Sequence, residues 1–327
     1  MSGVVELDYA ALIGPPTDET IAAIERGFSY SGLGLLIVRG VPGFVEARAQ
    51  CLPFSHRFGT LPPAVKARYE HAASFYSFGW SHGKEAFNGQ PDTAKGSYYF
   101  NPIEDAPGGA DASALASDLL PFLHPNIWPS EEDCAGFEAA CKRLAQLMVA
   151  AGAELARHVD AYVLRRTQAA GSSPPQATQL LEHIVKRSRT HKARLLYYFP
   201  AALDPAECAE GGSGAPSAAP AQETTSPWCG AHNDHGSLTA LTSAMFFNQA
   251  SGEALKGCPD PDAGLYIKTR AGETVRAPIP LDCLAFQIGE TAQILSGGAL
   301  QATPHWVRAP RGAASAGVSR GTLAVFM

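Results

Sequence analysis

The sequence is poor in charged residues and contains neither a Cys-x-x-Cys pair nor a long apolar run. Hydrophobic residues make up 46% and charged residues only 17% of the 327 positions, so the chain can bury a substantial core and is not disordered throughout. No apolar run is long enough to cross a membrane. Because the seven cysteines form no such pair and the first segment lacks a basic head, we expect reduced thiols in a cytoplasmic protein.

Excess positive charge is also absent. The formal net charge is -6 and the pI is about 5.9. A nucleic-acid backbone or an anionic membrane attracts a basic surface, so neither is expected as the main partner. We therefore expect a small-molecule substrate, and the sequence leaves the oligomeric state open.

The first part of the chain shows helical and mixed patterns. A helix is expected over Thr17–Arg26, followed by a short strand over Leu33–Val38, and a long amphipathic helix from Ser130 to about Tyr162. Residues 72–110 are rich in glycine, aromatic and polar residues, which is typical of an ordered functional loop. Residues 203–228 contain few large apolar side chains, so we expect a flexible surface insertion there.

The C-terminal half is predicted to be built from short strands. Proline and glycine separate apolar runs at short intervals, the pattern of an all-β barrel or sandwich. The expected strands are Arg194–Phe199, Leu238–Phe247, Leu265–Thr269, Thr274–Ala277, Cys283–Ile288, Thr303–Arg308 and Thr322–Phe326. We therefore predict a mainly β protein with flanking helices, organised as an N-terminal segment over 1–125, a helical support over 126–190 and a β core over 191–327.

A His-x-Asp pattern, which can hold a metal ion, occurs twice. His158-Val159-Asp160 lies in the expected long helix, where positions i and i+2 are about 200° apart around the axis and cannot face one ion. His232-Asn233-Asp234 lies where a strand is expected to begin, and on a strand these two positions share a face. The second pattern is therefore the candidate metal site.

A third ligand is expected from a distant histidine on a neighbouring strand, and His305 in the Thr303–Arg308 strand meets this requirement. Two neutral imidazoles and one carboxylate on one face of an ion leave the opposite positions open. Fe(II) enzymes that activate oxygen prefer this arrangement. We predict that His232, Asp234 and His305 bind the metal.

Several motifs, in the same order along the chain, resemble the 2-oxoglutarate and Fe(II)-dependent dioxygenases of the isopenicillin N synthase-like group. They are His232-Asn233-Asp234-His235-Gly236-Ser237-Leu238-Thr239, Ile288-Gly289-Glu290 with Gln293 and Ser296, Ala302-Thr303-Pro304-His305-Trp306-Val307, Arg320-Gly321-Thr322, and, near the start, Gly32–Pro42 and Leu61–Lys66.

This resemblance implies a double-stranded β-helix (jelly-roll or cupin-like) core and a reaction in which Fe(II), 2-oxoglutarate and O2 hydroxylate a small molecule with release of succinate and CO2. Arg320 and Thr322 would bind the far carboxylate of 2-oxoglutarate. Phe199 stands where many relatives carry a tyrosine before the proline, so Tyr197 could supply the hydroxyl instead. The chain ends at Met327, directly after the last expected strand, where relatives usually continue.

The composition of the 72–110 segment suggests the substrate contacts, which are Phe75, Tyr76, Trp80, His82 and Lys84. His235 is expected to face away from Asp234. Two alternatives stay open: an iron-dependent oxidase that does not use 2-oxoglutarate, and a non-catalytic metal- or ligand-binding module, for example one holding zinc, on the same scaffold. The sequence does not indicate which substrate is used.

Overall fold

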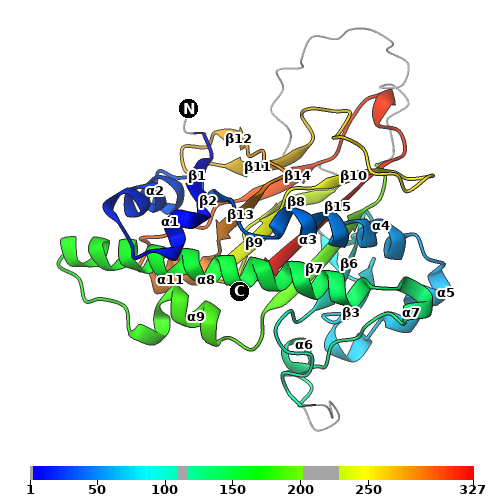
Figure 1. The fold of residues 1–327 in the computed structure, drawn as a ribbon, viewed down its shortest axis with the longest axis horizontal. Helices are drawn as coiled ribbons and strands as arrows, with labels where there is room; N and C mark the ends of the chain where they lie inside the picture. The colour runs from blue at the N-terminus through cyan, green and yellow to red at the C-terminus, as the bar shows by residue number, and fades with distance from the viewer. Residues whose placement is uncertain (1–2, 88, 110–115, 202–227) are drawn as a thin grey trace.

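A computed structural model describes residues 3–87, 89–109, 116–201 and 228–327 and places two β-sheets against a layer of helices (Figure 1). The expected insertion at 203–228 lies outside the described residues except for Trp228. That indole is buried and donates a hydrogen bond to the carbonyl of Phe199 at 2.9 Å. Trp228 therefore belongs to the folded core rather than to an insertion.

Among the described residues, nine strands form a large sheet and four form a small one. β1 and β2 pair in parallel, and the other pairs of these two sheets are antiparallel. The large sheet has the order β1 (Val5–Asp8), β2 (Leu35–Arg39), β13 (Cys283–Ile288), β9 (Leu238–Thr242), β15 (Val318–Phe326), β7 (Lys192–Tyr198), β6 (Lys95–Phe100) and β3 (Gly79–His82), with β10 (Met245–Asn248) also paired to β15. The small sheet has the order β12 (Thr274–Arg276), β11 (Gly264–Lys268), β14 (His305–Arg308) and β8 (Cys229–His232), and β4 (Ala86–Phe87) pairs with β5 (Gln90–Pro91).

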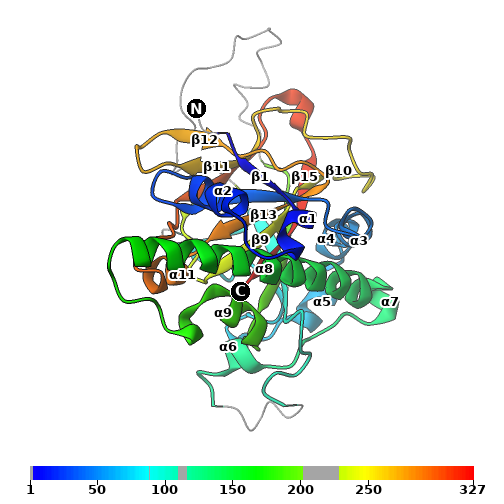
Figure 2. The ribbon, with the colours of Figure 1, turned by 60° about the vertical axis from the view of Figure 1, so that its left-hand side comes forward.

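The long helix α8 (Phe137–Ala169) crosses the outer face of the large sheet (Figures 1 and 2). Its apolar side chains recur at helical spacing and are buried, among them Phe137, Leu144 and Met148. The other α-helices within the described residues are α1 (Tyr9–Ile13), α2 (Asp18–Phe28), α3 (Phe44–Cys51), α4 (Pro53–Gly59), α5 (Pro63–Lys66), α6 (Leu120–Leu123), α7 (Glu131–Cys134), α9 (Leu181–Arg187) and α11 (Glu290–Leu295). None of the described helices is both long and apolar enough to cross a membrane.

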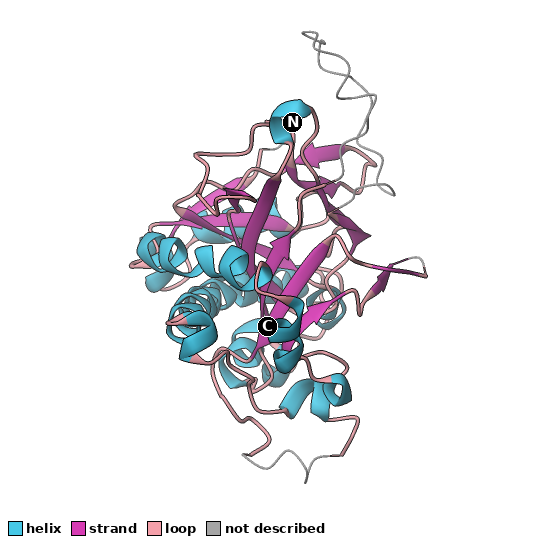
Figure 3. Ribbon diagram, turned by 90° about the vertical axis from the view of Figure 1, so that its right-hand side faces the viewer, coloured by secondary structure: helices cyan, strands magenta, loops and turns pink. Residues whose placement is uncertain are grey.

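Both faces of the large sheet are buried, and alternation along the strands decides which face each side chain takes. In β13, Leu284, Phe286 and Ile288 join the core beneath α8, whereas Cys283 and Ala285 join a second core between the two sheets. Most helices therefore gather on one side of the strands (Figure 3). The prediction of a mainly β fold with flanking helices is confirmed, and the space between the sheets becomes the interior in which a site can form.

Three local predictions need correction. The helix expected from Ser130 consists of two pieces, because Gly136 adopts a left-handed conformation (φ 78°) between α7 and α8. The segment 72–110, expected as a loop, contains β3 and β6 of the large sheet, since Trp80, Tyr98 and Phe100 pack into the core. The strand expected over Leu238–Phe247 divides into β9 and β10.

The division of that strand has a visible cause in Arg48 of α3. Its guanidinium donates hydrogen bonds to the carbonyls of Ser243 and Ala244, at 3.1 and 2.7 Å, at the point where the ladder of the sheet is interrupted. These two carbonyls are satisfied by a side chain instead of a neighbouring strand. A buried arginine far away in sequence therefore fixes a strand boundary that local pattern could not show.

The N-terminal strands β1, β2, β3 and β6 lie in the same sheet as strands from the C-terminal half. The first 125 residues therefore complete the sheet that carries the C-terminal core. The boundaries at 125/126 and 190/191 stay a prediction.

A partly buried lysine at the start of β7 gives a test of the fold. Lys192 donates to the carbonyls of Ser77 and Pro121, at 2.8 and 3.1 Å, and lies over the ring of Phe78, but burial lowers its pKa to about 7. Between this value and the usual lysine pKa of about 10.4, the unfolded chain binds more protons than the folded one, so stability rises with pH.

We expect the free energy of unfolding of the wild type, relative to Lys192→Met, to increase between pH 7 and pH 9 by up to about 1.4 kcal/mol per pH unit. Urea denaturation of both proteins at the two pH values measures this difference. A difference that does not change with pH would show that Lys192 stays charged throughout.

Candidate metal centre

The small sheet brings two of the predicted ligands directly opposite one another. His232 of β8 pairs with His305 of β14, and the centres of their rings are 4.3 Å apart. Asp234 follows β8, and its Oδ1 lies 3.8 Å from the Nε2 atom of each histidine. The three ligand atoms all lie within 4.8 Å of one another, which is a spacing that one ion can bridge.

The position of Asp234 has a different cause from the one expected. His232 ends β8 instead of beginning a strand, and Asp234 lies in the turn that follows. The carbonyl of Asp234 accepts a hydrogen bond of 2.8 Å from the backbone of Glu290, and the side chain of Glu290 accepts one of 2.9 Å from Asn233. The contact with the start of α11 therefore holds the carboxylate in place.

Hydrogen bonds at the far side of each imidazole leave Nε2 available to a metal. His232 Nδ1 donates to the carbonyl of Gly230 at 2.8 Å, and His305 Nδ1 lies 3.2 Å from the carbonyl of Thr303. The side-chain amide of Gln287 is 2.7 Å from the same Nδ1 atom of His305, and its oxygen can accept that proton when the amide is turned by a half rotation. Such contacts orient a metal-binding imidazole and fix its tautomer.

The charges at the site favour a cation. Burial lowers the pKa of His232, but the Cys229 sulfur in its thiolate form, the Gly230 carbonyl and Asp234 more than offset this, and the pKa rises to about 9. Burial and the neighbouring His232 hold the pKa of His305 below its usual range, although Asp234 opposes them. His232 is thus set up to hold positive charge beside Asp234, and a metal ion would replace its proton.

A cavity between the two sheets connects the three ligands with Arg320 and Thr322 of β15. Arg320 is only 4% exposed, and its Nε and Nη1 atoms have no hydrogen-bond partner in the described part of the chain. Its guanidinium lies over the ring of Tyr198, 4.6 Å from the ring centre. Burying a guanidinium without a carboxylate partner costs free energy. An anionic ligand in this cavity would therefore supply the partner that Arg320 lacks.

Thr322 lies two residues further along β15 and lines the same cavity, but its hydroxyl donates to the carbonyl of Thr242 at 3.1 Å. That hydroxyl can still accept a hydrogen bond, as a hydroxyl has two lone pairs.

Tyr197 lies on the other face of β7, away from the cavity. Its hydroxyl contacts Gln249, and its ring packs against His56. Register explains this, because Arg320 pairs with Tyr198 and Thr322 pairs with Leu196, so the cavity-facing residues of β7 are Arg194, Leu196 and Tyr198. Tyr197 therefore does not line the cavity as predicted, whereas its neighbour Tyr198 does.

None of the five expected substrate contacts lines this cavity. Trp80 is buried in the core, Phe75 is 73% exposed, and Lys84 pairs with Glu70 at 3.0 Å. Tyr76 packs beside Lys84, and His82 Nε2 lies 3.0 Å from the carbonyl of Thr93. Trp80 and His82 belong to the edge strand β3, and Phe75, Tyr76 and Lys84 lie just before or after it.

The sequence reasoning missed polar residues that do line the cavity, namely Lys95, Arg194 and Cys229. Arg194 is held by Glu85, and Lys95 pairs with Asp92. The sequence offered one signal for Arg194. Side chains alternate between the two faces of a strand, so Arg194 and Tyr198 point to the same side of the predicted strand Arg194–Phe199.

The other His-x-Asp pattern is structural. His158 is fully buried in α8, with Nδ1 2.9 Å from the Thr20 hydroxyl and Nε2 3.0 Å from the Leu12 carbonyl. Asp160 accepts hydrogen bonds from the backbone of Leu181 and Glu182, both at 2.8 Å. His235, next to the metal triad, is 91% exposed and pairs with Glu290, so it faces away from Asp234 as predicted.

Gln287→Leu is expected to weaken Fe(II) binding roughly 10- to 100-fold, because His305 loses the amide that orients it. Gln287 is 3% exposed, so leucine fills the same space, and Gln287→Glu serves as the control because it keeps an oxygen acceptor. Equilibrium dialysis measures both affinities. Equal affinity of Gln287→Leu and wild type would remove Gln287 from the site.

No protein-family model and no curated protein matches the chain in sequence. Solved structures are similar over nearly its whole length. A full-length Neurospora crassa protein, crystallised in complex with alpha-KG and thymine, has a TM-score of 0.66 at 20% identity, over 99% of this chain and 85% of that one.

A protein of Caulobacter crescentus described as a member of the 2OG-Fe(II) oxygenase family has a TM-score of 0.63 at 18% identity, over 100% of this chain and 87% of that one. The rice dioxygenase for auxin oxidation has a TM-score of 0.57 at 19% identity, over 99% of this chain and 82% of that one. The chain therefore has the jelly-roll fold of the 2OG-Fe(II) oxygenases, as the sequence resemblance implied.

Proposed function

We propose that the protein is an Fe(II)- and 2-oxoglutarate-dependent dioxygenase that hydroxylates a small molecule and releases succinate and CO2. The observation that carries this proposal is Arg320, a buried guanidinium with two unpartnered N–H groups, in the same cavity as His232, Asp234 and His305. A metal triad alone fits many functions. A triad that shares a cavity with an unmatched cation fits a metal-chelating anion, and 2-oxoglutarate is one.

The residues of the triad fit Fe(II). His232 and His305 would each offer Nε2, and Asp234 would offer a carboxylate oxygen that offsets part of the ion's charge. When bound, Fe(II) supplies the activation of O2 that is coupled to oxidative decarboxylation of 2-oxoglutarate. The protein contributes the fixed ligand geometry described above.

Arg320 would bind and orient the far carboxylate of 2-oxoglutarate, with its two free N–H groups donating to the two carboxylate oxygens. Thr322 would donate one further hydrogen bond to the same carboxylate, with its proton turned away from the Thr242 carbonyl. The ring of Tyr198, whose centre lies 4.6 Å from the guanidinium, supports Arg320 from one side. Leu241 and Val307 also line the cavity, and their apolar side chains would exclude water from it.

The molecules crystallised with structural neighbours support a small-molecule substrate. The Neurospora crassa protein has been crystallised in complex with thymine and with 5-formyluracil, and a protein named JOX2 in complex with 2OG, Fe and JA. The substrate of this protein would approach from the side of His232, where Lys95, Arg194 and Cys229 lie. Membership of the isopenicillin N synthase-like group and a cytoplasmic location are part of the same proposal.

The oxidase alternative shares the triad but has no use for Arg320. The non-catalytic alternative, a metal- or ligand-binding module, would use the same histidines without turnover. Both are separated from the proposal by the fate of 2-oxoglutarate.

The experiment incubates the purified protein with Fe(II), ascorbate, 2-oxoglutarate and a panel of small metabolites in air and measures succinate by mass spectrometry. We expect succinate that depends on Fe(II) and O2 and increases with one class of metabolite. Substrate oxidation without succinate would favour the oxidase, and no turnover with any metabolite, together with tight binding of zinc, would favour the binding module.

A further inference from the structure

A second cavity lies behind the site, and its lining is strongly basic. It has a volume of about 350 Å³ and lies between the β9–β10 junction, the β10–β11 connection and the segment after β12. Four cationic residues line it, Arg48, Lys256, Arg276 and Arg320, and no aspartate or glutamate does. We call it the basic cavity. Its volume falls in the range of small-molecule sites.

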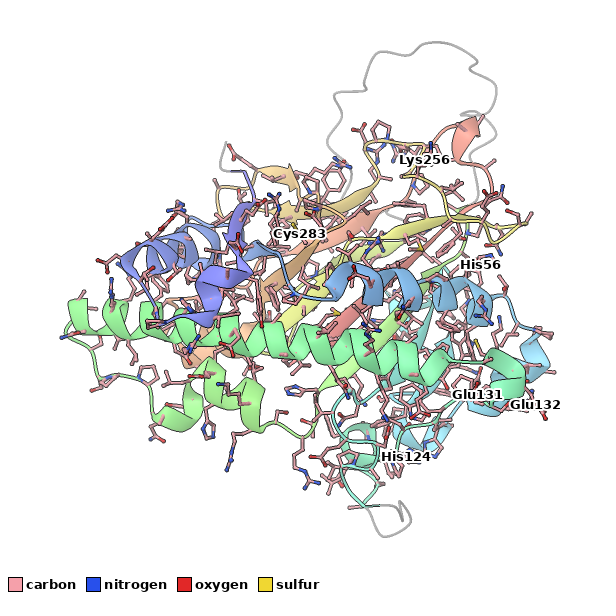
Figure 4. All side chains as sticks on the ribbon, in the orientation of Figure 1. His56, His124, Glu131, Glu132, Lys256 and Cys283 are labelled. Carbon is pink, nitrogen blue, oxygen red and sulfur yellow. The ribbon has the colours of Figure 1, made fainter. Side chains whose placement is uncertain are left out.

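The four cations are not matched by the protein itself. None of them makes an ion pair with any residue in the described part of the chain. Arg48 and Arg320 are buried, at 6% and 4% exposure. Lys256 and Arg276 are exposed at the rim, and Lys256 lies on the connection after β10 (Figure 4). Buried charge is normally paired, so the missing partner points to an anion from outside the chain.

Arg48 differs from an ordinary structural arginine. Its guanidinium donates to two backbone carbonyls, those of Ser243 and Ala244, which leaves its positive charge uncompensated. Burial lowers the pKa of Arg48 to about 10, so it stays charged at neutral pH while bearing a desolvation cost. An anion in the cavity would offset that cost.

Unsatisfied hydrogen-bonding atoms lie at the same place. Ser243 is 3% exposed and lines the basic cavity, and its hydroxyl has no hydrogen-bond partner in the described residues. The free Nε and Nη1 atoms of Arg320 belong to a side chain that lines this cavity as well as the metal cavity. Buried polar atoms in native proteins are nearly always satisfied, so the Ser243 hydroxyl marks a binding position, and Arg320 connects this position with the metal cavity.

The rest of the lining is apolar and includes Met245, Phe246, Leu255, Ile279 and Leu281. A phosphate or another small inorganic anion would leave these side chains without contact. A molecule with one charged end and an apolar body would satisfy both parts of the lining.

We propose that the basic cavity binds a small organic carboxylate with an apolar tail, at a site separate from the position of 2-oxoglutarate. The carboxylate lies beside Arg48 and Ser243, and the tail extends along Met245 and Ile279 toward the rim. Because Arg320 lines both cavities, this ligand and 2-oxoglutarate influence one another's binding.

The probe is octanoate, and octan-1-ol, which has the same chain length but no charge, is the control ligand. Isothermal titration calorimetry measures the binding of each to the metal-free protein. We expect one octanoate per chain and no binding of octan-1-ol. Arg48→Gln should weaken octanoate binding roughly tenfold or more, because a charge-assisted contact is lost. The double variant Lys256→Gln with Arg276→Gln should weaken it roughly threefold, as expected for exposed charges.

Arg270→Gln is the matched control, because Arg270 is an exposed arginine near the same β11–β12 hairpin that does not line the cavity. It should bind octanoate as the wild type does. If Arg48→Gln fails to fold, the rim double variant decides, since both of its residues are exposed.

Absence of octanoate binding, or binding that the rim and Arg48 variants leave unchanged, would overturn the proposal. The measurement contains neither Fe(II) nor 2-oxoglutarate. Its failure is therefore distinct from a failure of the proposed dioxygenase function, which succinate release reports.

Discussion

Asp234→Ala is expected to reduce the affinity for Fe(II) by more than about 100-fold, because two facing imidazoles without their carboxylate offer neither the charge nor the third ligand that holds the ion. Asp234 Oδ1 is the atom common to both close contacts in the triad, at 3.8 Å from His232 Nε2 and from His305 Nε2. Equilibrium dialysis under nitrogen measures the affinity. Circular dichroism shows whether the variant keeps its fold.

Two histidine variants serve as controls for the loss of Fe(II) binding in Asp234→Ala. His235→Ala removes an exposed imidazole one residue from Asp234 and should bind Fe(II) as the wild type does. His158→Ala removes the histidine of the other His-x-Asp pattern and should lower stability, since its hydrogen bonds to Thr20 and Leu12 are lost, without changing Fe(II) binding. Weaker Fe(II) binding by His235→Ala, or unchanged binding by Asp234→Ala, would mean that the metal lies elsewhere.

Arg320→Gln is expected to weaken 2-oxoglutarate binding by about 2–5 kcal/mol, a factor of roughly 30 to several thousand, while Fe(II) affinity stays unchanged. The reason is the loss of the Arg320 guanidinium. Among the described residues that line the metal cavity, it is the one buried cation with N–H groups that lack a hydrogen-bond partner. The 2-oxoglutarate affinity of Arg320→Lys should lie between those of the wild type and Arg320→Gln, because an ammonium group keeps the charge but cannot donate two parallel hydrogen bonds. Titration of the Fe(II)-loaded protein with 2-oxoglutarate gives the affinities.

Arg39→Gln is the matched control for Arg320. Arg39 is an exposed arginine at the end of β2, already paired with Glu6 and Asp282, so its loss should leave 2-oxoglutarate binding unchanged. If Arg320→Gln bound 2-oxoglutarate with wild-type affinity, the cosubstrate would not use this guanidinium and the oxidase alternative would gain support.

The sequence could predict the metal triad because each member carries a local signal. His232 ends a short strand and Asp234 follows it, and His305 lies in another strand. Periodicity also separated these residues from His158-x-Asp160, because a helix cannot present both side chains to one ion. The pairing of His232 with His305 across β8 and β14 is a long-range contact that the sequence only suggested.

The predictions that failed depended on register or on distant partners. Tyr197 and Tyr198 differ by one position, and one position decides which face of β7 a side chain takes. The register of β7 with β15 places Tyr198 beside Arg320, and the sequence of neither strand predicts this register. The break between β9 and β10 depends on Arg48, almost two hundred residues away in sequence. Trp80 was expected at a substrate, but an aromatic residue in a glycine-rich segment fits an edge strand of the core equally well.

The most direct test of the proposed metal site is the visible absorption of the Fe(II)–2-oxoglutarate complex under nitrogen. Chelation of Fe(II) by the keto acid end of 2-oxoglutarate gives a weak charge-transfer band, so the wild type and His235→Ala should show this band when both components are added. His232→Ala should not, because its triad lacks one ligand. A wild type without the band, or a band that persists in His232→Ala, would contradict the assignment of the site.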